Sequence, residues 1–219
     1  MMIVHPVFSS PIDMNENEAL VFVIENNAFF REFIDDISSQ ISGEDGHTVI
    51  SENYSPINMK SVFLISDYFN IDLNDRTTAG RINSNLIDIS ENEIFDKTNQ
   101  FKEYAFNYFS DLISRADFDL SFDDLDFSAI LKCLKIHINE SDLFLERIID
   151  VIKIHSLIFG AKLIVFVNLK TFLSPSELGE VYKFCGYNKI SVMLIENTQR
   201  ERIENEKVVI IDDDLCEIY

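Results

Sequence analysis

The sequence predicts an α/β fold with a sheet built from both ends of the chain. Residues 163–168 form an unbroken apolar run rich in β-branched side chains, which is typical of a strand covered on both faces. Residues 174–177, Ser-Pro-Ser-Glu, match the start of a helix, with serine as N-cap and proline at the first helical position. Further apolar runs follow at 190–195 and 208–211. Strand, helix and strand at this spacing indicate a parallel βαβ unit with a right-handed connection.

The N-terminal part also favours strands. Residues 3–8 and 20–24 are strand candidates, and residues 61–66 are a third, although a helix starting near Asn58 is an alternative there. Between them, Asn26 or Asn27 is expected to cap a helix that continues to about residue 41.

The middle of the chain changes to a helical pattern. Ser90 and Glu93 match a capping box that would open a long helix. Four helices are expected, at about 78–88, 90–115, 125–136 and 142–159. The apolar positions of the long helix alternate steps of four and three, which indicates a coiled-coil-like seam: Ile94, Thr98, Phe101, Ala105, Tyr108 and Leu112.

We therefore expect an α/β head domain made of residues 1–69 and 161–219, and a helical domain made of residues 70–160. No apolar run is long enough to cross a bilayer, and the N-terminus lacks the basic flank of a signal peptide. The three cysteines are odd in number and widely spaced, which indicates reduced thiols in a cytoplasmic protein.

The net charge of −20 argues against nucleic acid as a partner, because phosphates attract lysine and arginine and repel an acidic surface. A DNA-binding protein of this composition would need its few basic residues gathered on one surface, or its acidic groups neutralised by metal. The six glycines form neither a Walker phosphate loop nor a dinucleotide fingerprint. The histidines lack metal-ligand spacing and no nucleophile motif is present, so the sequence does not support catalysis by these groups.

The densest group of charges is acidic. Calcium prefers several converging carboxylate oxygens, which clustered aspartates can supply. The spacing departs from a calcium-binding EF-hand, because Phe122 stands where glycine is required and Ser128 where the bidentate glutamate belongs. Two interpretations stay open at this point, a solvated acidic turn and a cation site. The group comprises Asp117, Asp119, Asp123, Asp124 and Asp126.

Basic residues are few but partly paired along the expected helices. Lys132 and Lys135 are one turn apart and would share a face of one helix. A solvated helix surface and a stripe that faces DNA are both compatible with this pattern. The six candidates are Arg76, Arg81, Lys97, Lys102, Lys132 and Lys135.

The combination of these segments resembles a known family. The 163–168 strand, the 173–177 helix start, the 191–196 strand and the acidic stretch 117–126 after a long helix are similar to those of the type II-A CRISPR adaptation protein. This is the small DNA-end-binding protein encoded beside the RNA-guided effector nuclease and the integrase. The resemblance covers essentially the whole chain in length and element order.

The resemblance implies a head like that of P-loop ATPases but without a Walker motif, with an inserted helical leg. It also implies a calcium-binding homotetrameric ring that takes double-stranded DNA ends through a basic central hole. Such a ring acts in spacer acquisition with the CRISPR integrase complex and the effector nuclease, and has no nuclease activity of its own.

The resemblance implies roles for two sets of residues in this chain. The implied calcium ligands are Asp119, Asp123, Asp124 and Asp126, and the implied DNA contacts are Lys132, Lys135, Arg76, Arg81, Lys97 and Lys102.

Two alternative functions remain. One is a metal-dependent nuclease that uses the 117–126 cluster, and the other is an acidic protein-interaction module without DNA binding.

Overall fold

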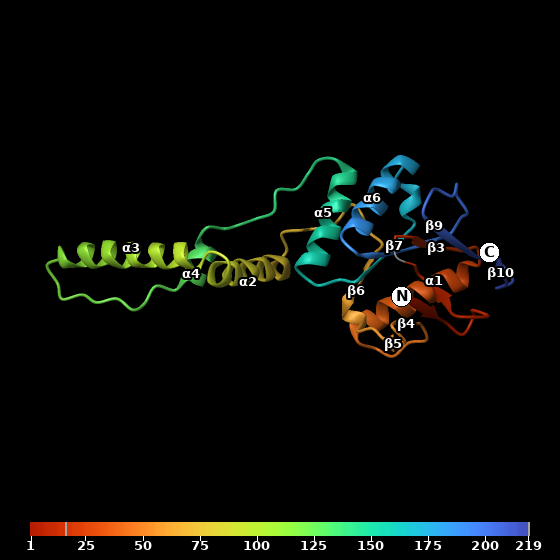
Figure 1. Cartoon of the computed structure of the whole chain (residues 1–219), viewed down its shortest axis with the longest axis horizontal. Helices are drawn as coiled ribbons and strands as arrows, with labels where there is room; N and C mark the ends of the chain where they lie inside the picture. The colour runs from red at the N-terminus through yellow and green to blue at the C-terminus, as the bar shows by residue number, and fades with distance from the viewer. Residues whose placement is uncertain (16, 219) are drawn as a thin grey trace. The chain divides into compact units, whose positions relative to one another are not determined.

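Five of the six apolar runs expected to be strands pair, with the additional short strand β10, into a six-stranded sheet in the computed structural model of the chain, which describes residues 1–15 and 17–218 (Figure 1). The five strands from β9 to β6 are parallel, and the short β10 pairs antiparallel with β9. The fold is therefore mixed α/β, as predicted. In spatial order the strands are β10 (Glu217–Ile218), β9 (Glu206–Ile211), β3 (Ala19–Ile24), β8 (Ser191–Glu196), β7 (Leu163–Val167) and β6 (Val62–Ile65).

The predicted strand–helix–strand unit is confirmed. β7 and β8 are parallel neighbours, with Val165 opposite Met193. The helix between them in sequence, α6 (Pro175–Tyr187), begins with a complete capping box. The Ser174 N–H donates to Glu177 Oε2 at 2.8 Å, and the Glu177 N–H donates to Ser174 Oγ at 3.4 Å. These bonds satisfy N–H groups that the helix start would otherwise leave without a partner.

Helices cover both faces of the central strands. α1 (Asn27–Ser42) lies on one face, and α5 (Phe144–Leu157) and α6 lie on the other (Figure 1). α1 is capped by Asn26 and buries Phe29, Phe33 and Ile37 against the sheet. All residues of β3 and β7 are buried, as expected for strands covered twice.

A second, antiparallel sheet of short strands was not expected. The predicted strand 3–8 is too long, because the Phe8 N–H donates to the His5 carbonyl at 3.0 Å and turns the chain. β4 and β5 form a hairpin around Asn53 and Tyr54, which both have positive φ. This pair lacks the glycine that usually marks such a turn in sequence. The strands are, in spatial order, β2 (Ile12–Asp13), β1 (Met2–Val4), β4 (Val49–Glu52) and β5 (Ser55–Pro56).

The chain divides into two units. The head unit consists of Met1–Ile71 and Glu140–Tyr219, and the leg unit consists of Asp72–Asn139. The expected helical domain extended to residue 160, whereas α5 belongs to the head unit, where it packs against α6. α5 buries Ile148, Val151, Ile152 and Ile154, so it is part of the head core despite its helical neighbours in sequence.

Three helices form the leg unit: α2 (Arg76–Asn92), α3 (Phe95–Ser114) and α4 (Phe127–Cys133). The capping box predicted at Ser90 and Glu93 is wrong. Ser90 lies inside α2, where its hydroxyl donates to the Ile87 carbonyl at 2.8 Å, and α3 starts after Ile94 without a side-chain cap. The Thr98 hydroxyl donates to the Ser90 carbonyl at 2.8 Å and ties α3 to α2. No helix in the described part of the chain, α3 included, is long and apolar enough to cross a membrane.

The connection from β3 to α1 bears on the expected head type. Only Glu25 and Asn26 separate the strand from the helix, and the Asn26 side chain accepts from Ala28 N and Phe29 N. This connection is too short for a glycine-rich loop around a phosphate. The likeness of the head to P-loop ATPases stays a prediction.

One buried ion pair secures the head. Lys170, in the 3-10 helix η2 (Leu169–Thr171), places its Nζ 2.8 Å from Oε2 of Glu206, and both side chains are almost fully buried. The Tyr182 hydroxyl donates to the other oxygen, Oε1, at 2.8 Å. The pair therefore joins η2, α6 and β9 across 36 residues of sequence.

Lys170→Met is expected to lower the free energy of unfolding by about 3–5 kcal/mol, because it leaves the buried Glu206 carboxylate without its cation. Urea unfolding of the two proteins measures the difference. Lys153→Met is the control, since Lys153 pairs with Asp150 at 2.9 Å on the surface, where a pair contributes about 0–1 kcal/mol. Equal losses in the two variants would contradict this account of the buried pair.

Candidate nucleic-acid interface

The six basic residues singled out in the sequence all belong to the leg unit. Five of them are solvent-exposed and Lys102 is half-buried. Because α4 packs against α2, and α2 against α3, the helices that carry them form one packed group. They lie on α2 (Arg76 and Arg81), on α3 (Lys97 and Lys102), and on α4 or directly after it (Lys132 and Lys135).

Lys102 connects α3 to the start of α4. Its Nζ lies 5.9 Å from the centroid of the Phe127 ring, a cation–π contact. The same ring meets Phe101 edge-on at 6.1 Å between centroids. Lys102 is therefore partly committed to holding α4 in place.

The structure changes the expected relation between Lys132 and Lys135. The predicted helix 125–136 is shorter, because α4 ends at Cys133 and Lys135 has a φ of 50°. A residue in this left-handed conformation no longer follows the helix. The two lysines therefore do not share a helix face, although both side chains remain exposed within three residues of each other.

The leg unit contains seven of the chain's 18 basic residues and a larger number of acidic residues, so its net charge is negative. The seventh, Arg115, was not among the sequence candidates and is exposed at the C-terminal end of α3. It lies 18 residues, or five helical turns, from Lys97, so the two share one face of α3. That spacing is the signal by which Arg115 could have been found.

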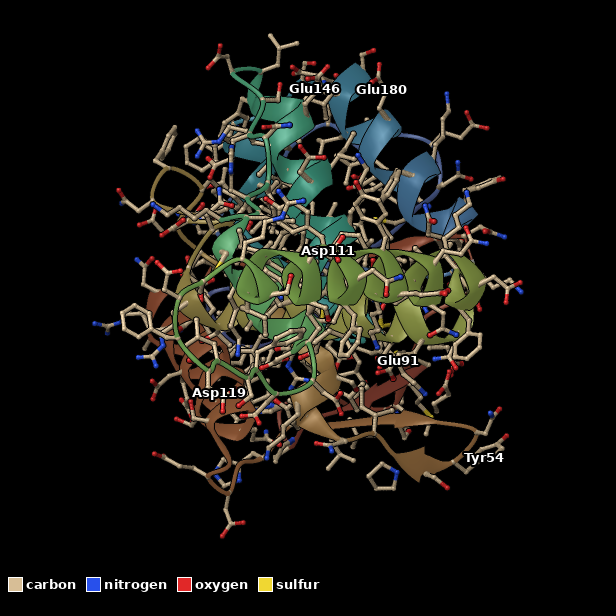
Figure 2. The ribbon with its side chains drawn as sticks, turned by 90° about the vertical axis from the view of Figure 1, so that its left-hand side faces the viewer. Tyr54, Glu91, Asp111, Asp119, Glu146 and Glu180 are labelled. Carbon is tan, nitrogen blue, oxygen red and sulfur yellow. The ribbon has the colours of Figure 1, made fainter. Side chains whose placement is uncertain are left out.

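The aspartates at 117–126 do not form the compact turn suggested by their spacing. Residues 115–126 contain no helix or strand and run back along α3 (Figure 1). Phe122 anchors this segment, with its ring 5.2 Å from Phe106 and 6.2 Å from Phe109. The segment is thus extended, and Figure 2 shows Asp119 on it, apart from Asp111 on α3.

The four candidate calcium ligands are separated by this extended path. Asp126 is the N-cap of α4, and its Oδ1 accepts from the Ala129 N–H at 3.2 Å. Asp119, Asp123 and Asp124 are exposed. Across residues 1–15 and 17–218, no three or more histidine, cysteine, aspartate or glutamate side chains come together in a way that could hold a metal ion. As arranged in a single chain, these residues do not fit a calcium site.

The leg unit exposes a row of large apolar side chains on α3. Phe101, Tyr104, Tyr108 and Leu112 are 44%, 74%, 56% and 52% exposed. Their spacing of three, four and four residues places them along one side of α3. Three of them, Phe101, Tyr108 and Leu112, were predicted positions of the seam, Tyr104 was not, and the predicted Thr98 is instead buried against α2. We call these four residues the α3 strip.

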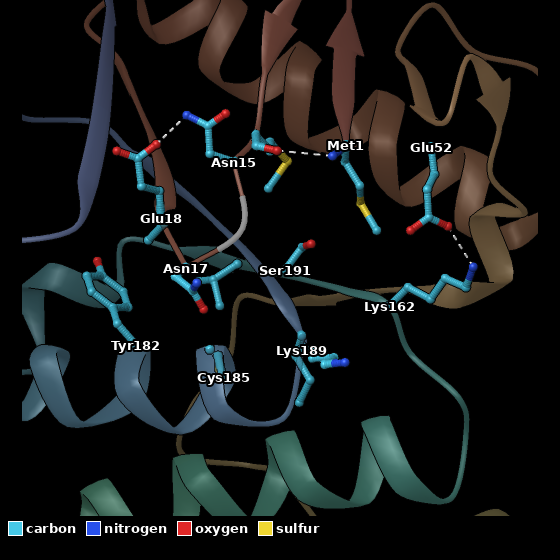
Figure 3. A pocket seen from close by; sticks show the side chains of 15 residues that line it. Met1, Asn15, Asn17, Glu18, Glu52, Lys162, Tyr182, Cys185, Lys189 and Ser191 are labelled. Carbon is cyan, nitrogen blue, oxygen red and sulfur yellow. Dashed lines mark hydrogen bonds and ion pairs between the residues drawn. The ribbon is translucent and has the colours of Figure 1, made fainter.

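The head unit contains a cavity of about 360 Å³ at the N-terminal ends of β3 and β8 (Figure 3). Cys185 and Val192 line it, as do Lys162 and Glu52, which form an ion pair of 2.8 Å. Burial raises the pKa of the Cys185 thiol to about 12, so this cysteine is not a nucleophile at neutral pH. The described lining carries no arrangement that indicates catalysis.

Two of the histidines are packing residues. His5 is buried among the rings of Phe8, Phe29 and Phe33, and its Nδ1 accepts from the Val7 N–H at 3.2 Å. Burial lowers the pKa of His5, so the neutral ring is favoured. His155 stacks against Phe63.

Comparisons with known proteins identify the family. The family described as CRISPR-associated protein (Cas_Csn2) matches residues 40–215, which include the complete leg unit and most of the head unit. The chain belongs to the Csn2 family. A relative, the CRISPR-associated protein Csn2 of Enterococcus faecalis, is 23% identical over 187 residues, which cover 82% of each chain. The resemblance to the type II-A CRISPR adaptation protein is thereby confirmed.

Proposed function

We propose that four copies of this Csn2-family protein form a ring that holds double-stranded DNA, preferentially at its ends, and so supports spacer acquisition without cutting the DNA. Membership of a CRISPR-associated family supports a role in adaptation. The integrase complex and the RNA-guided effector nuclease are the partners we propose for the DNA-bound ring.

The α3 strip is the observation that carries the assembly. Large apolar side chains in a continuous row on one helix are unusual on the surface of a monomer and are typical of an interface. A second copy of the same strip is a suitable partner, because most soluble oligomers pair identical surfaces by symmetry. Tyr104 and Tyr108 can bury their rings in such a contact while their hydroxyls reach its polar border.

Assembly also explains how a chain with a large negative net charge could bind DNA. One leg unit offers seven basic residues among a larger number of acidic ones, which is too few to attract DNA strongly. Four copies arranged around one aperture would multiply the local positive charge. Because these contacts would be to phosphates, binding should be independent of sequence and should weaken steeply with salt.

Calcium is a further part of the proposal. Asp119, Asp123 and Asp124 do not converge in one chain, so a site would require a change in the 117–126 segment or ligands from two chains. No observation in the described residues favours the alternative of a metal-dependent nuclease built on the same aspartates.

A gel-shift experiment tests the function. Linear duplex should be retained and closed circular duplex should not, and chelation of calcium should weaken retention at least about tenfold. Asp123→Asn with Asp124→Asn should imitate the chelator. Asp213→Asn with Asp214→Asn, an exposed pair in the head unit, should not. Equal retention of both DNA forms, with or without calcium, would overturn the proposal, and cleavage with magnesium that Asp123→Ala abolishes would replace it with the nuclease.

A further inference from the structure

Two carboxyl groups and one ammonium group are buried together in the head unit. Glu196, the last residue of β8, and Glu206, the first of β9, are each 1% exposed, and Lys170 is 8% exposed. The ammonium Nζ of Lys170 lies 2.8 Å from Glu206. Among the described residues, Glu196 accepts a hydrogen bond only from the backbone N–H of Lys170, which donates to its Oε1 at 2.9 Å. One buried positive charge therefore faces two buried acidic side chains.

Hydrogen bonds decide which acid is ionised. Oε2 of Glu206 accepts from Lys170 Nζ and from the Ile203 N–H at 3.0 Å, and Oε1 accepts from the Tyr182 hydroxyl. Oε2 of Glu196 has no hydrogen-bond partner among the described residues. A buried carboxylate with one donor and no cation of its own is costly, so the proton belongs on Glu196.

The surroundings of Glu196 set the pH at which this proton is lost. Burial raises the pKa of Glu196 to about 7, against the lowering effects of the Lys170 N–H and of the charges on Lys170 and Arg200. The Glu206 carboxylate adds to the increase in pKa. The charged and titratable groups that face Glu196 come from five elements. They are Lys170 of η2, Arg200 of the loop after β8, Glu206 of β9, Tyr182 of α6, and Tyr68 of the segment after β6.

The same groups hold the loop 197–205, which connects β8 to β9. Lys170 Nζ donates to the Glu201 carbonyl at 2.9 Å. The Ile203 N–H donates to the Glu206 carboxylate, and the Arg202 guanidinium donates twice to the Glu206 carbonyl, at 3.1 and 2.8 Å. The Asn197 N–H also donates to Asn168 Oδ1, and the Arg200 guanidinium donates to Thr171 Oγ1, each at 3.0 Å. The charge balance around Lys170 therefore controls the bonds at Glu201, Arg202 and Ile203, whereas the start of the loop has supports of its own.

We propose that Glu196 is a proton-dependent latch for the loop 197–205. With the proton on Glu196, the Lys170 ammonium binds the Glu206 carboxylate and the Glu201 carbonyl, and the loop is closed. When Glu196 ionises, a second negative charge competes for Lys170, and openings of the loop that bring Glu196 into water become more frequent.

The direction of the pH effect follows from the raised pKa. The ordinary value for a glutamate is 4.5, so the closed state binds a proton that the open state releases between that pH and about 7. The stabilisation is present below the ordinary value and is lost as the pH rises through about 7. Between pH 5.5 and 8.5 the frequency of such openings should rise by up to about thirtyfold.

Hydrogen exchange of the full chain tests the latch. Protection factors, which correct for the chemistry of exchange, are compared at pH 5.5 and pH 8.5 for the Ile203 amide, which donates to the Glu206 carboxylate when the loop is closed. We expect protection in the natural protein to fall by up to about thirtyfold, and protection in Glu196→Gln to stay constant. Amides of α3, which belong to the leg unit, report on changes unrelated to Glu196.

Glu201→Gln is the matched control. Its exposed carboxyl lies in the same loop, and only its backbone carbonyl binds Lys170, so this variant should keep the natural pH dependence. Equal protection of the natural loop at both pH values would overturn the latch, even if Glu196→Gln failed to fold. An equal fall in Glu196→Gln and in the natural protein would also overturn it.

Discussion

Replacement of Tyr108 and Leu112 by glutamate is expected to break the four-copy assembly at the α3 strip and to lower its mass from about 101 kDa to that of two chains or one, at 25.3 kDa per chain. Both side chains are more than half exposed on the α3 strip, and two copies of the strip would bury them. A glutamate in that contact would have to lose its hydration without a cation to pair with, which costs several kcal/mol per group. Sedimentation equilibrium measures the mass, and circular dichroism verifies that the helices persist.

The control for this variant carries the same added charge on another side of α3. Asn99→Glu with Asn107→Glu places two glutamates at exposed positions outside the α3 strip and should leave the assembly intact. If the two double variants have the same mass, the α3 strip is not the interface.

Lys132→Glu with Lys135→Glu should weaken the retention of linear duplex at least about tenfold and should make the dependence of affinity on salt shallower. Both side chains are exposed at the end of α4, and in a ring each change would be repeated in every copy. The physical cause is the loss of phosphate contacts, each of which contributes about 0.9 to the slope of log affinity against log salt. Fluorescence anisotropy across a salt series gives both quantities.

Lys183→Glu with Lys189→Glu provides the comparison, since it introduces the same charge change at exposed sites in the head unit. We expect a much smaller effect on affinity, transmitted only through the total charge. Unchanged retention in the Lys132 and Lys135 variant would favour the protein-interaction module without DNA binding.

Much of the head could be predicted because its signals are local. The β7–α6–β8 unit is encoded by an apolar run, a capping box and a second apolar run within 34 residues, and each was recognised. The Asn26 cap of α1 was recognised for the same reason. α5 was assigned to the wrong unit, because its apolar stripe shows that it is buried but does not show against which partner.

The features that were missed depend on contacts distant in sequence or on competing local bonds. Lys170 and Glu206 are 36 residues apart, and no pattern in the sequence marks them as a pair. Ser90 had the spacing of a helix cap, but its hydroxyl bonds to the Ile87 carbonyl inside α2 instead. Lys135 lost its expected place beside Lys132 because α4 ends two residues earlier, at Cys133.

The mass of the natural protein with and without a short linear duplex tests the central claim most directly. In the presence of calcium we expect an assembly of about 101 kDa, four times 25.3 kDa, that carries one linear duplex through its aperture and does not take up a closed circle. A single chain of 25.3 kDa that retains no duplex under the same conditions would contradict the account.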